Sequence, residues 1–150
     1  MALPAADRSD RPVVHREPVR VYWEDTDAGG VVFYANYLKF FERARTEWLR
    51  SLGFGQQRLR DETGLIFVVT ETTVRYHRPA RLDDRLELTV ALHALHRASL
   101  RVVQQAWRGD ELLAEGDIRI GCVSAADFRP QRLPAPLTAA LAPLDNHTQE

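Results

Sequence analysis

An acidic, glycine-rich run near the start of the chain carries the residue types that chemistry on a carbonyl requires. Asp25 and Asp27 precede Gly29 and Gly30, and an apolar helical pattern begins a few residues later. A carboxylate can attack a carbonyl or activate water, and unpaired N–H groups at a helix start can hold the oxyanion that forms. The run therefore indicates acyl chemistry. The structural alternative is a tight turn in which Asp25 or Asp27 only accepts hydrogen bonds from the main chain.

Two elements are expected to position this run. Before it, the alternation of Val19, Val21 and Trp23 with Arg20 and Tyr22 predicts a strand. After it, apolar residues at three-to-four spacing predict a helix over residues 37–53 that ends near the last glycine of that range. Because this helix is apolar around much of its girth, we expect other elements to wrap around it. Its inward stripe consists of Tyr37, Phe41, Ala44, Trp48 and Leu52.

Two neighbouring segments resemble the signature of hotdog-fold acyl-CoA thioesterases of the 4-hydroxybenzoyl-CoA thioesterase type. They are EDTDAGGVVFYANY at residues 24–37 and the following Glu42-Arg43-Ala44-Arg45. The resemblance is strongest to the branch associated with the Tol-Pal cell-envelope system. It extends from about residue 19 to about residue 130 and includes YHRPARLDD at residues 76–84. It implies an α+β hotdog fold, in which a five-stranded antiparallel sheet wraps around one long central helix and paired subunits share active sites.

The resemblance also implies roles for single residues. Asp27 corresponds to the catalytic carboxylate, and main-chain N–H groups in the stretch from Gly30 and Val31 to Tyr34 would hold the thioester carbonyl. Tyr34 stands where the Tol-Pal branch commonly has His, so a main-chain role and a proton-handling role of the phenol are both open there. Asn36 could cap the helix or orient the site.

The rest of the chain predicts four more strands and two short helical segments. Strands are expected over residues 65–78, 86–92, 100–107 and 112–123, with Gly109-Asp110 as a turn. Their short connections predict an antiparallel meander, joined by the first strand, and five strands with one long helix agree with the hotdog fold. Residues 54–64 predict a short helix or ordered loop, and residues 137–141 a short helix. One domain over residues 13–142 is expected between a disordered tail at 1–12 and a flexible tail at 143–150.

Composition excludes several other classes of protein. A chain of 150 residues with 20 Lys and Arg against 21 acidic residues lacks the basic excess of a nucleic-acid-binding protein. No apolar run has the length of a signal peptide or a membrane span. The single Cys122 cannot form an internal disulfide and lies in an apolar alternating run, which predicts a buried, inert thiol.

Metal chemistry has little support in the sequence. His93 and His96 differ by three positions on a strand and would point to opposite faces, which disfavours a zinc site. The acidic run begins like a calcium loop, but Gly29 and Asn36 stand where ligands are required. No metal or cofactor is therefore expected. Glu42 and Arg45, at i,i+3 spacing on the helix, favour a structural ion pair, with a substrate contact as the alternative.

The sequence therefore predicts a cytoplasmic acyl-CoA thioesterase. The substrate would be an acyl-CoA or an acyl carrier protein thioester, with Asp27 as nucleophile or general base. Because a single curled sheet leaves an edge strand open, we expect a homodimer or homotetramer. The rival hypothesis is a non-catalytic hotdog protein that binds an acyl ligand or a partner in an envelope or lipid-synthesis complex. A binder has no need for a costly carboxylate beside a buried thioester, which counts against it.

Overall fold

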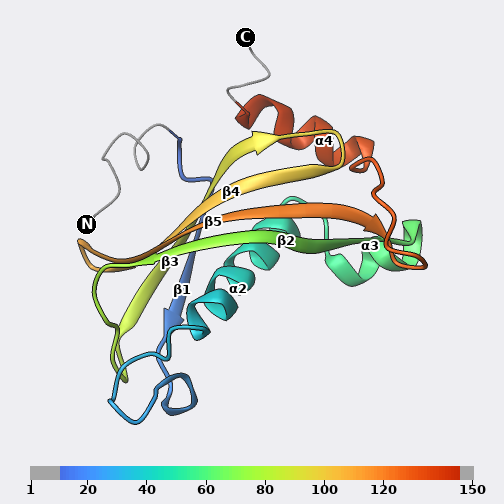
Figure 1. Ribbon diagram of the computed structural model, residues 1–150. Helices are drawn as coiled ribbons and strands as arrows, with labels where there is room; N and C mark the ends of the chain where they lie inside the picture. The colour runs from blue at the N-terminus through green and yellow to red at the C-terminus, as the bar shows by residue number, and fades with distance from the viewer. Residues whose placement is uncertain (1–10, 146–150) are drawn as a thin grey trace.

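The computed structural model describes residues 11–145, which form one five-stranded antiparallel sheet around a long helix (Figure 1). The strands are β1 (His15–Arg20), β2 (Leu65–Tyr76), β3 (Arg85–Leu95), β4 (Ser99–Arg108) and β5 (Glu111–Ser124). Their order across the sheet is β1-β3-β4-β5-β2. The predicted α+β hotdog architecture is confirmed.

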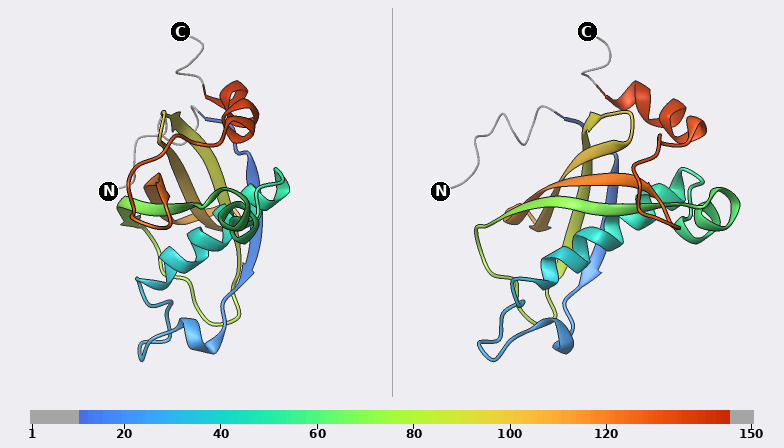
Figure 2. Two further views of the ribbon diagram at one scale, coloured as in Figure 1. Left: turned by 90° about the vertical axis from the view of Figure 1, so that its right-hand side faces the viewer. Right: turned by 45° about the vertical axis from the view of Figure 1, so that its right-hand side comes forward.

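The central helix α2 (Asn36–Ser51) lies along one face of the sheet, and the sheet curves around it (Figure 2). Its buried side chains, including Phe40, Phe41 and Trp48, meet the inward residues of the strands in one hydrophobic core. Gly116 on β5 permits this approach, because a Cβ atom there would lie 3.0 Å from the Phe41 ring. The predicted helix is confirmed, and the chain leaves it through Gly53, whose φ of +93° suits a residue without a side chain.

Shorter elements cover the ends of the core. Helix α3 (Gln56–Thr63) occupies the segment predicted as a short helix or ordered loop, and α4 (Ala135–Leu141) confirms the predicted C-terminal helix. A 3₁₀ turn, η2 (Ala142–Leu144), follows, and the buried side chain of Asp145 accepts a hydrogen bond from the N–H of Leu95 at 3.1 Å. The folded part therefore continues past residue 142. Most of the two predicted tails lies outside the described residues.

None of the helices within residues 11–145 has the length and apolar composition needed to span a bilayer.

The first strand is shorter than its alternating pattern predicts. It ends at Arg20, and residues Trp23–Asp25 form a 3₁₀ turn, η1, that leaves Trp23 81% exposed. The Asp25 carboxylate explains this end of the strand, because its Oδ2 accepts the main-chain N–H of Tyr22 at 2.8 Å. Because the N–H of Tyr22 donates to Asp25 and not to a neighbouring strand, the chain turns away from the sheet at this point.

The prediction of a four-strand meander was wrong for β2. Only β3, β4 and β5 are consecutive neighbours, whereas β2 pairs with β5 at the far edge of the sheet. The connection over residues 77–84 carries the chain from that edge past the start of α2, where the N–H of Ala80 donates to the hydroxyl of Tyr37 at 3.2 Å. Arg108 fixes the connection by donating to the carbonyl of Pro79 at 3.2 Å and to Oδ2 of Asp84 at 2.7 Å.

Candidate active site

The loop between β1 and α2 is held in place by Asp25, which is only 7% exposed. Besides capping η1 with its carboxylate, Asp25 accepts two hydrogen bonds at its main-chain oxygen. The N–H of Phe33 donates at 3.0 Å and the side-chain amide of Asn36 at 2.8 Å. Asn36 therefore orients the loop against the helix and does not cap the helix. The turn-forming role considered for Asp25 is confirmed.

Asp27 is placed differently, although only one residue separates the two carboxylates. Its side chain is exposed, and Oδ1 accepts the N–H of Gly29 at 2.8 Å. Its main chain closes the turn, since the N–H of Gly30 donates to the Asp27 oxygen at 3.0 Å with Gly30 at a φ of +78°. Within residues 11–145, Oδ2 of Asp27 accepts no hydrogen bond. Asp27 thus shapes the turn and still presents a carboxylate oxygen.

The Asp27 side chain faces a hollow of about 530 Å³. The exposed ring of Trp23 and the side chain of Leu82 contribute apolar surface to this hollow, and the turn residues Thr26, Ala28 and Gly30 contribute the remainder. A carboxylate beside apolar walls and an open volume can meet the carbonyl of a bound acyl group. The geometry is compatible with attack by the carboxylate or by a water that it activates.

The predicted oxyanion donors are only partly available. The N–H groups of Gly30, Val32 and Phe33 donate to Asp27, Ala80 and Asp25 respectively. Outside the helices and strands of the described chain, no hydrogen bond is donated by the N–H groups of Val31, Tyr34 or Ala35. Tyr34 and Ala35 come directly before Asn36, the first residue of α2, where the helix dipole adds positive potential. The Gly30 N–H is committed to the turn, so Val31, Tyr34 and Ala35 are the main-chain candidates.

Three tyrosines line a second hollow, of about 250 Å³, beside the helix start. The exposed Tyr34 ring meets Tyr76 edge-on at 6.3 Å between centroids, and Tyr76 meets Tyr37 at 5.6 Å. The hydroxyl of Tyr76 donates to the main-chain oxygen of Tyr34 at 3.0 Å. A phenol is ordinarily neutral at neutral pH, and burial raises the pKa of Tyr37 and of Tyr76 further. Sequence reasoning missed Tyr76 as a site residue, although it begins the recognised run at residues 76–84.

The ion pair favoured for Glu42 and Arg45 is wrong. No contact within 4.0 Å joins them; Arg45 instead donates to Oε1 of Gln104 at 3.0 Å, and Gln104 donates to the carbonyl of Phe41 at 2.9 Å. Burial lowers the pKa of Arg45, and the charge of Glu42 opposes this shift. Gln104 is fully buried under the helix, so its amide requires partners there. The feature of the sequence that could have indicated this bond is a Gln at an inward-facing position of an apolar strand.

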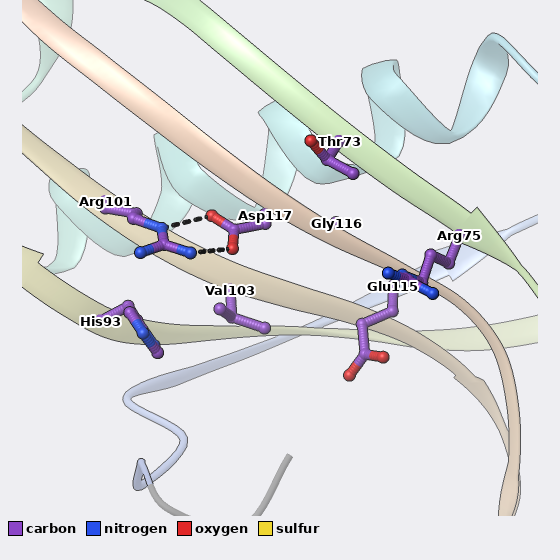
Figure 3. Close-up of a pocket in the computed structure, with 8 residues that line it drawn as sticks. All are labelled: Thr73, Arg75, His93, Arg101, Val103, Glu115, Gly116 and Asp117. Atoms are coloured by element: carbon purple, nitrogen blue, oxygen red, sulfur yellow. Dashed lines mark hydrogen bonds and ion pairs between the residues drawn. The ribbon is translucent and has the colours of Figure 1, made fainter. Parts of the chain in front are cut away.

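A further hollow lies on the sheet face opposite α2 (Figure 3). Two of its charged residues, Arg101 and Asp117, form an ion pair, and a third, Glu115, is buried. Arg101 donates from Nε to Asp117 at 2.6 Å and again from Nη2, while Gln105 donates to Oε2 of the buried Glu115 at 2.6 Å. This face therefore contributes cross-strand stability and does not border the Asp27 loop.

The two histidines and Cys122, which were also considered in the sequence, lie away from the Asp27 loop. No group of three or more His, Cys, Asp or Glu residues within residues 11–145 is placed to hold a metal ion. His93 lies at a β-bulge, where the pairing of β3 with β4 shifts between Leu92 and Ala94. Cys122 is buried, and burial raises the pKa of its thiol, which makes it a poor nucleophile.

Comparison with known proteins connects this geometry to a family. The profile of the thioesterase-like superfamily matches residues 21–141, a range that includes the Asp27 loop, α2 and strands β2 to β5. The chain belongs to the thioesterase-like superfamily. The hotdog resemblance noted in the sequence is confirmed at this level.

Relatives and solved structures of the superfamily cover most of the chain. Acyl-CoA thioester hydrolase YbgC of Escherichia coli O6:H1 is 46% identical over 125 residues, covering 83% of this chain and 92% of the relative. Acyl-CoA thioesterase YbgC of Haemophilus influenzae is 43% identical over 123 residues, covering 82% and 90%. A probable thioesterase from Bartonella henselae superposes with a TM-score of 0.77 at 34% identity, covering 82% of this chain and 100% of that chain.

Proposed function

We propose that this protein hydrolyses acyl-CoA thioesters to a carboxylic acid and free CoA. The observation that carries the proposal is the exposed Asp27 carboxylate at the same short segment as the uncommitted N–H groups of Val31, Tyr34 and Ala35. Relatives that share most of this chain are named acyl-CoA thioester hydrolase or acyl-CoA thioesterase, which supports the same activity here.

The proposed reaction begins with the thioester carbonyl oxygen at the helix start. Main-chain donors and the helix dipole stabilise the negative charge that develops on this oxygen in the transition state. Asp27 has two possible roles. As nucleophile, its carboxylate attacks the carbonyl carbon, the C–S bond breaks with the electron pair leaving on sulfur, and water then cleaves the mixed anhydride. As general base, it takes a proton from the attacking water.

The loop contacts give each remaining predicted residue a role in this proposal. Asn36 holds the main chain of Asp25, and Gly30 supplies the turn that brings Asp27 close to the helix start. Tyr34 contributes its N–H, while its ring and Tyr76 form a wall of the adjacent hollow. The proposed substrate is acyl-CoA, with an acyl carrier protein thioester as a second source of the same bond. We further propose that the protein is cytoplasmic and acts as a homodimer or homotetramer without a metal or cofactor.

A thiol-release assay tests the activity directly. Purified protein is incubated with acetyl-, butyryl-, dodecanoyl- and benzoyl-CoA, and free CoA is detected with a thiol reagent. The proposal predicts release that is proportional to enzyme concentration for at least one ester. Release at the rate of the enzyme-free control for all four esters would remove the proposal and would favour the non-catalytic binding role.

A further inference from the structure

Two consecutive peptide units directly before α2 carry N–H groups that donate no hydrogen bond within residues 11–145. The first unit, between Phe33 and Tyr34, is fixed by the helix start, because the carbonyl of Phe33 accepts the N–H of Asn36 at 2.8 Å. The second unit, between Tyr34 and Ala35, is fixed by a side chain from another element. Its oxygen accepts the hydroxyl of Tyr76, the last residue of β2, at 3.0 Å.

The helix itself does not hold the Tyr34–Ala35 peptide. Ala35 already has helical backbone angles, with φ at −71° and ψ at −19°. The N–H of Leu38, however, donates to the carbonyl of Ala35 at 3.1 Å and not to that of Tyr34. In the described part of the chain, the hydroxyl of Tyr76 is therefore the one hydrogen-bond partner of the Tyr34 oxygen.

The planarity of the peptide couples its two polar groups. In a trans peptide the C=O and N–H bonds point in opposite directions and turn together. A hydrogen bond that holds the Tyr34 oxygen consequently also sets the direction of the Ala35 N–H. The same bond polarises the amide, which makes its N–H a stronger donor. At a helix start such an N–H points out of the helix, into the positive potential of the dipole.

Tyr76 can impose this orientation because its own position is fixed. It ends the pairing of β2 with β5, and the next N–H along the chain, that of His77, donates to the carbonyl of Leu113 at 2.8 Å. Its ring lies edge-on to Tyr37 at 5.6 Å and to Tyr34 at 6.3 Å between centroids. Strand pairing on one side and aromatic contacts on the other therefore hold the hydroxyl against the peptide.

We propose that Tyr76 is a positioning residue for the thioesterase reaction: its hydroxyl orients the Tyr34–Ala35 peptide so that the Ala35 N–H donates to the thioester oxygen as negative charge develops there. Tyr76 does not itself touch the reacting atoms. A donor aimed in advance at the developing charge needs no reorientation during the reaction, which is the source of its catalytic effect. The inference rests on the proposed function and adds a residue of β2 to a site otherwise formed by the loop before α2.

Tyr76→Phe tests the inference, because it removes the hydroxyl and keeps the ring. On the acyl-CoA ester that the unaltered protein hydrolyses fastest, kcat should fall by about tenfold. This is less than the loss of about 10²–10³ for a deleted oxyanion donor, because the N–H remains and only its fixed direction is lost. KM should change by less than about twofold, since the donor acts mainly in the transition state. Tyr22→Phe, which removes an exposed hydroxyl from the loop after β1, is the control and should change neither constant by more than about twofold.

Nuclear magnetic resonance observes the peptide itself, because Tyr34–Ala35 is the only Tyr–Ala pair in the sequence. Labelling with ¹³C-carbonyl tyrosine and ¹⁵N-alanine therefore gives one cross-peak in a carbonyl-correlated spectrum. The probe is the ketone analogue of the same ester, in which CH₂ replaces the thioester sulfur. Its addition to the unaltered protein should move the Ala35 amide proton downfield. In Tyr76→Phe the Tyr34 carbonyl carbon should move upfield, because it loses a hydrogen bond, and the response of the amide proton to the analogue should be smaller.

Several results would overturn the inference. They are a kcat of Tyr76→Phe within about twofold of the unaltered protein, a loss confined to KM, and an Ala35 amide proton that does not move at an analogue concentration that inhibits hydrolysis. Circular dichroism establishes whether the variant is folded, and if it is not, the resonance of the unaltered protein decides. Each of these results leaves the proposed function intact, because the unaltered protein still releases CoA. Absence of CoA release from every ester by the unaltered protein would remove the proposed function itself.

Discussion

Asp25 and Asp27 illustrate how neighbouring carboxylates acquire different roles. Asp25 is buried; its Oδ2 accepts the N–H of Tyr22, and its main-chain oxygen accepts the N–H of Phe33 and the amide of Asn36. Asp27 is exposed and keeps Oδ2 free of partners within the described residues. Because a nucleophile or base must reach the substrate, only Asp27 satisfies the requirement.

Tyr34 provides a prediction at the same scale. If its main-chain N–H holds the thioester oxygen, Tyr34→Phe keeps the donor and should lose less than about tenfold in kcat, against the 10²–10³ typical of a lost oxyanion donor. The exposed Tyr34 ring contacts the Phe33 ring at 4.8 Å and the Tyr76 ring at 6.3 Å between centroids. Its hydroxyl makes no hydrogen bond within residues 11–145, so removal of the hydroxyl should not disturb the helix start. Steady-state kinetics from pH 6 to 9 on Tyr34→Phe and Tyr34→His provide the measurement. A hundredfold loss in the Phe variant that His restores, with a new titration near pH 6.5, would assign the work to the side chain.

Among the elements, the connection between β2 and β3 has the greatest effect on the site. It crosses the helix start, where the carbonyl of Ala80 accepts the N–H of Val32 at 2.8 Å, and it is fixed to β4 through Arg108 and Asp84. Burial opposes the charged form of Asp84, but hydrogen bonds from the N–H of Arg81 and from Arg108 outweigh burial and lower its pKa. The contribution of Asp84 to stability is therefore complete above the unfolded carboxyl pKa, about 3.9, and is lost as the pH falls through the folded value.

Asp84→Asn should consequently destabilise the protein at neutral pH and have a smaller effect in acid. We expect a loss of about 1 kcal/mol at pH 7, because the pair with Arg108 remains partly exposed. Urea unfolding at pH 7 and pH 3 measures the difference, with Asp83→Asn as control, since Asp83 has a φ of +71° that Asn tolerates. An equal loss at both pH values would show that charge is not responsible.

Individual elements show what the sequence could and could not predict. The period of α2 and the alternation of β3 depend on local patterns that the core reproduces, so both were predictable. The partner of β2 was not, because a strand with apolar residues on both faces indicates no neighbour and residues 77–84 are long enough to cross the sheet. The motif around Asp27 was enough to propose it as the candidate catalytic carboxylate. The contact of Tyr76 with Tyr34 and the bond of Arg45 to Gln104 join positions far apart in the chain, so no local pattern contains them. The burial of Asp25 likewise depends on the folded chain around it.

For the whole molecule, the two edge strands β1 and β2 end the sheet within the described residues, and their outer main-chain groups remain available for pairing. Exposed apolar residues surround the same site loop: Tyr22, Trp23, Phe33, Tyr34 and Leu82. An open edge together with exposed aromatic residues favours association with a second copy.

Light scattering at micromolar concentration tests the predicted assembly. We expect a mass of at least twice the 17.1 kDa of the single chain. A single-chain mass that persists as the concentration rises would rule out a shared site and would require one copy to complete the reaction alone.

The turnover of Asp27→Asn tests the central claim most directly. The amide keeps the shape of the side chain and can still accept the N–H of Gly29, but it can neither attack the carbonyl nor accept a proton from water. On an acyl-CoA ester that the unaltered protein hydrolyses, kcat should fall by about 10² or more, with unchanged circular dichroism. Glu24→Gln removes an exposed charge from the same loop and should retain near-normal kcat. Near-normal turnover in a folded Asp27→Asn protein would contradict the assignment of the chemistry to Asp27.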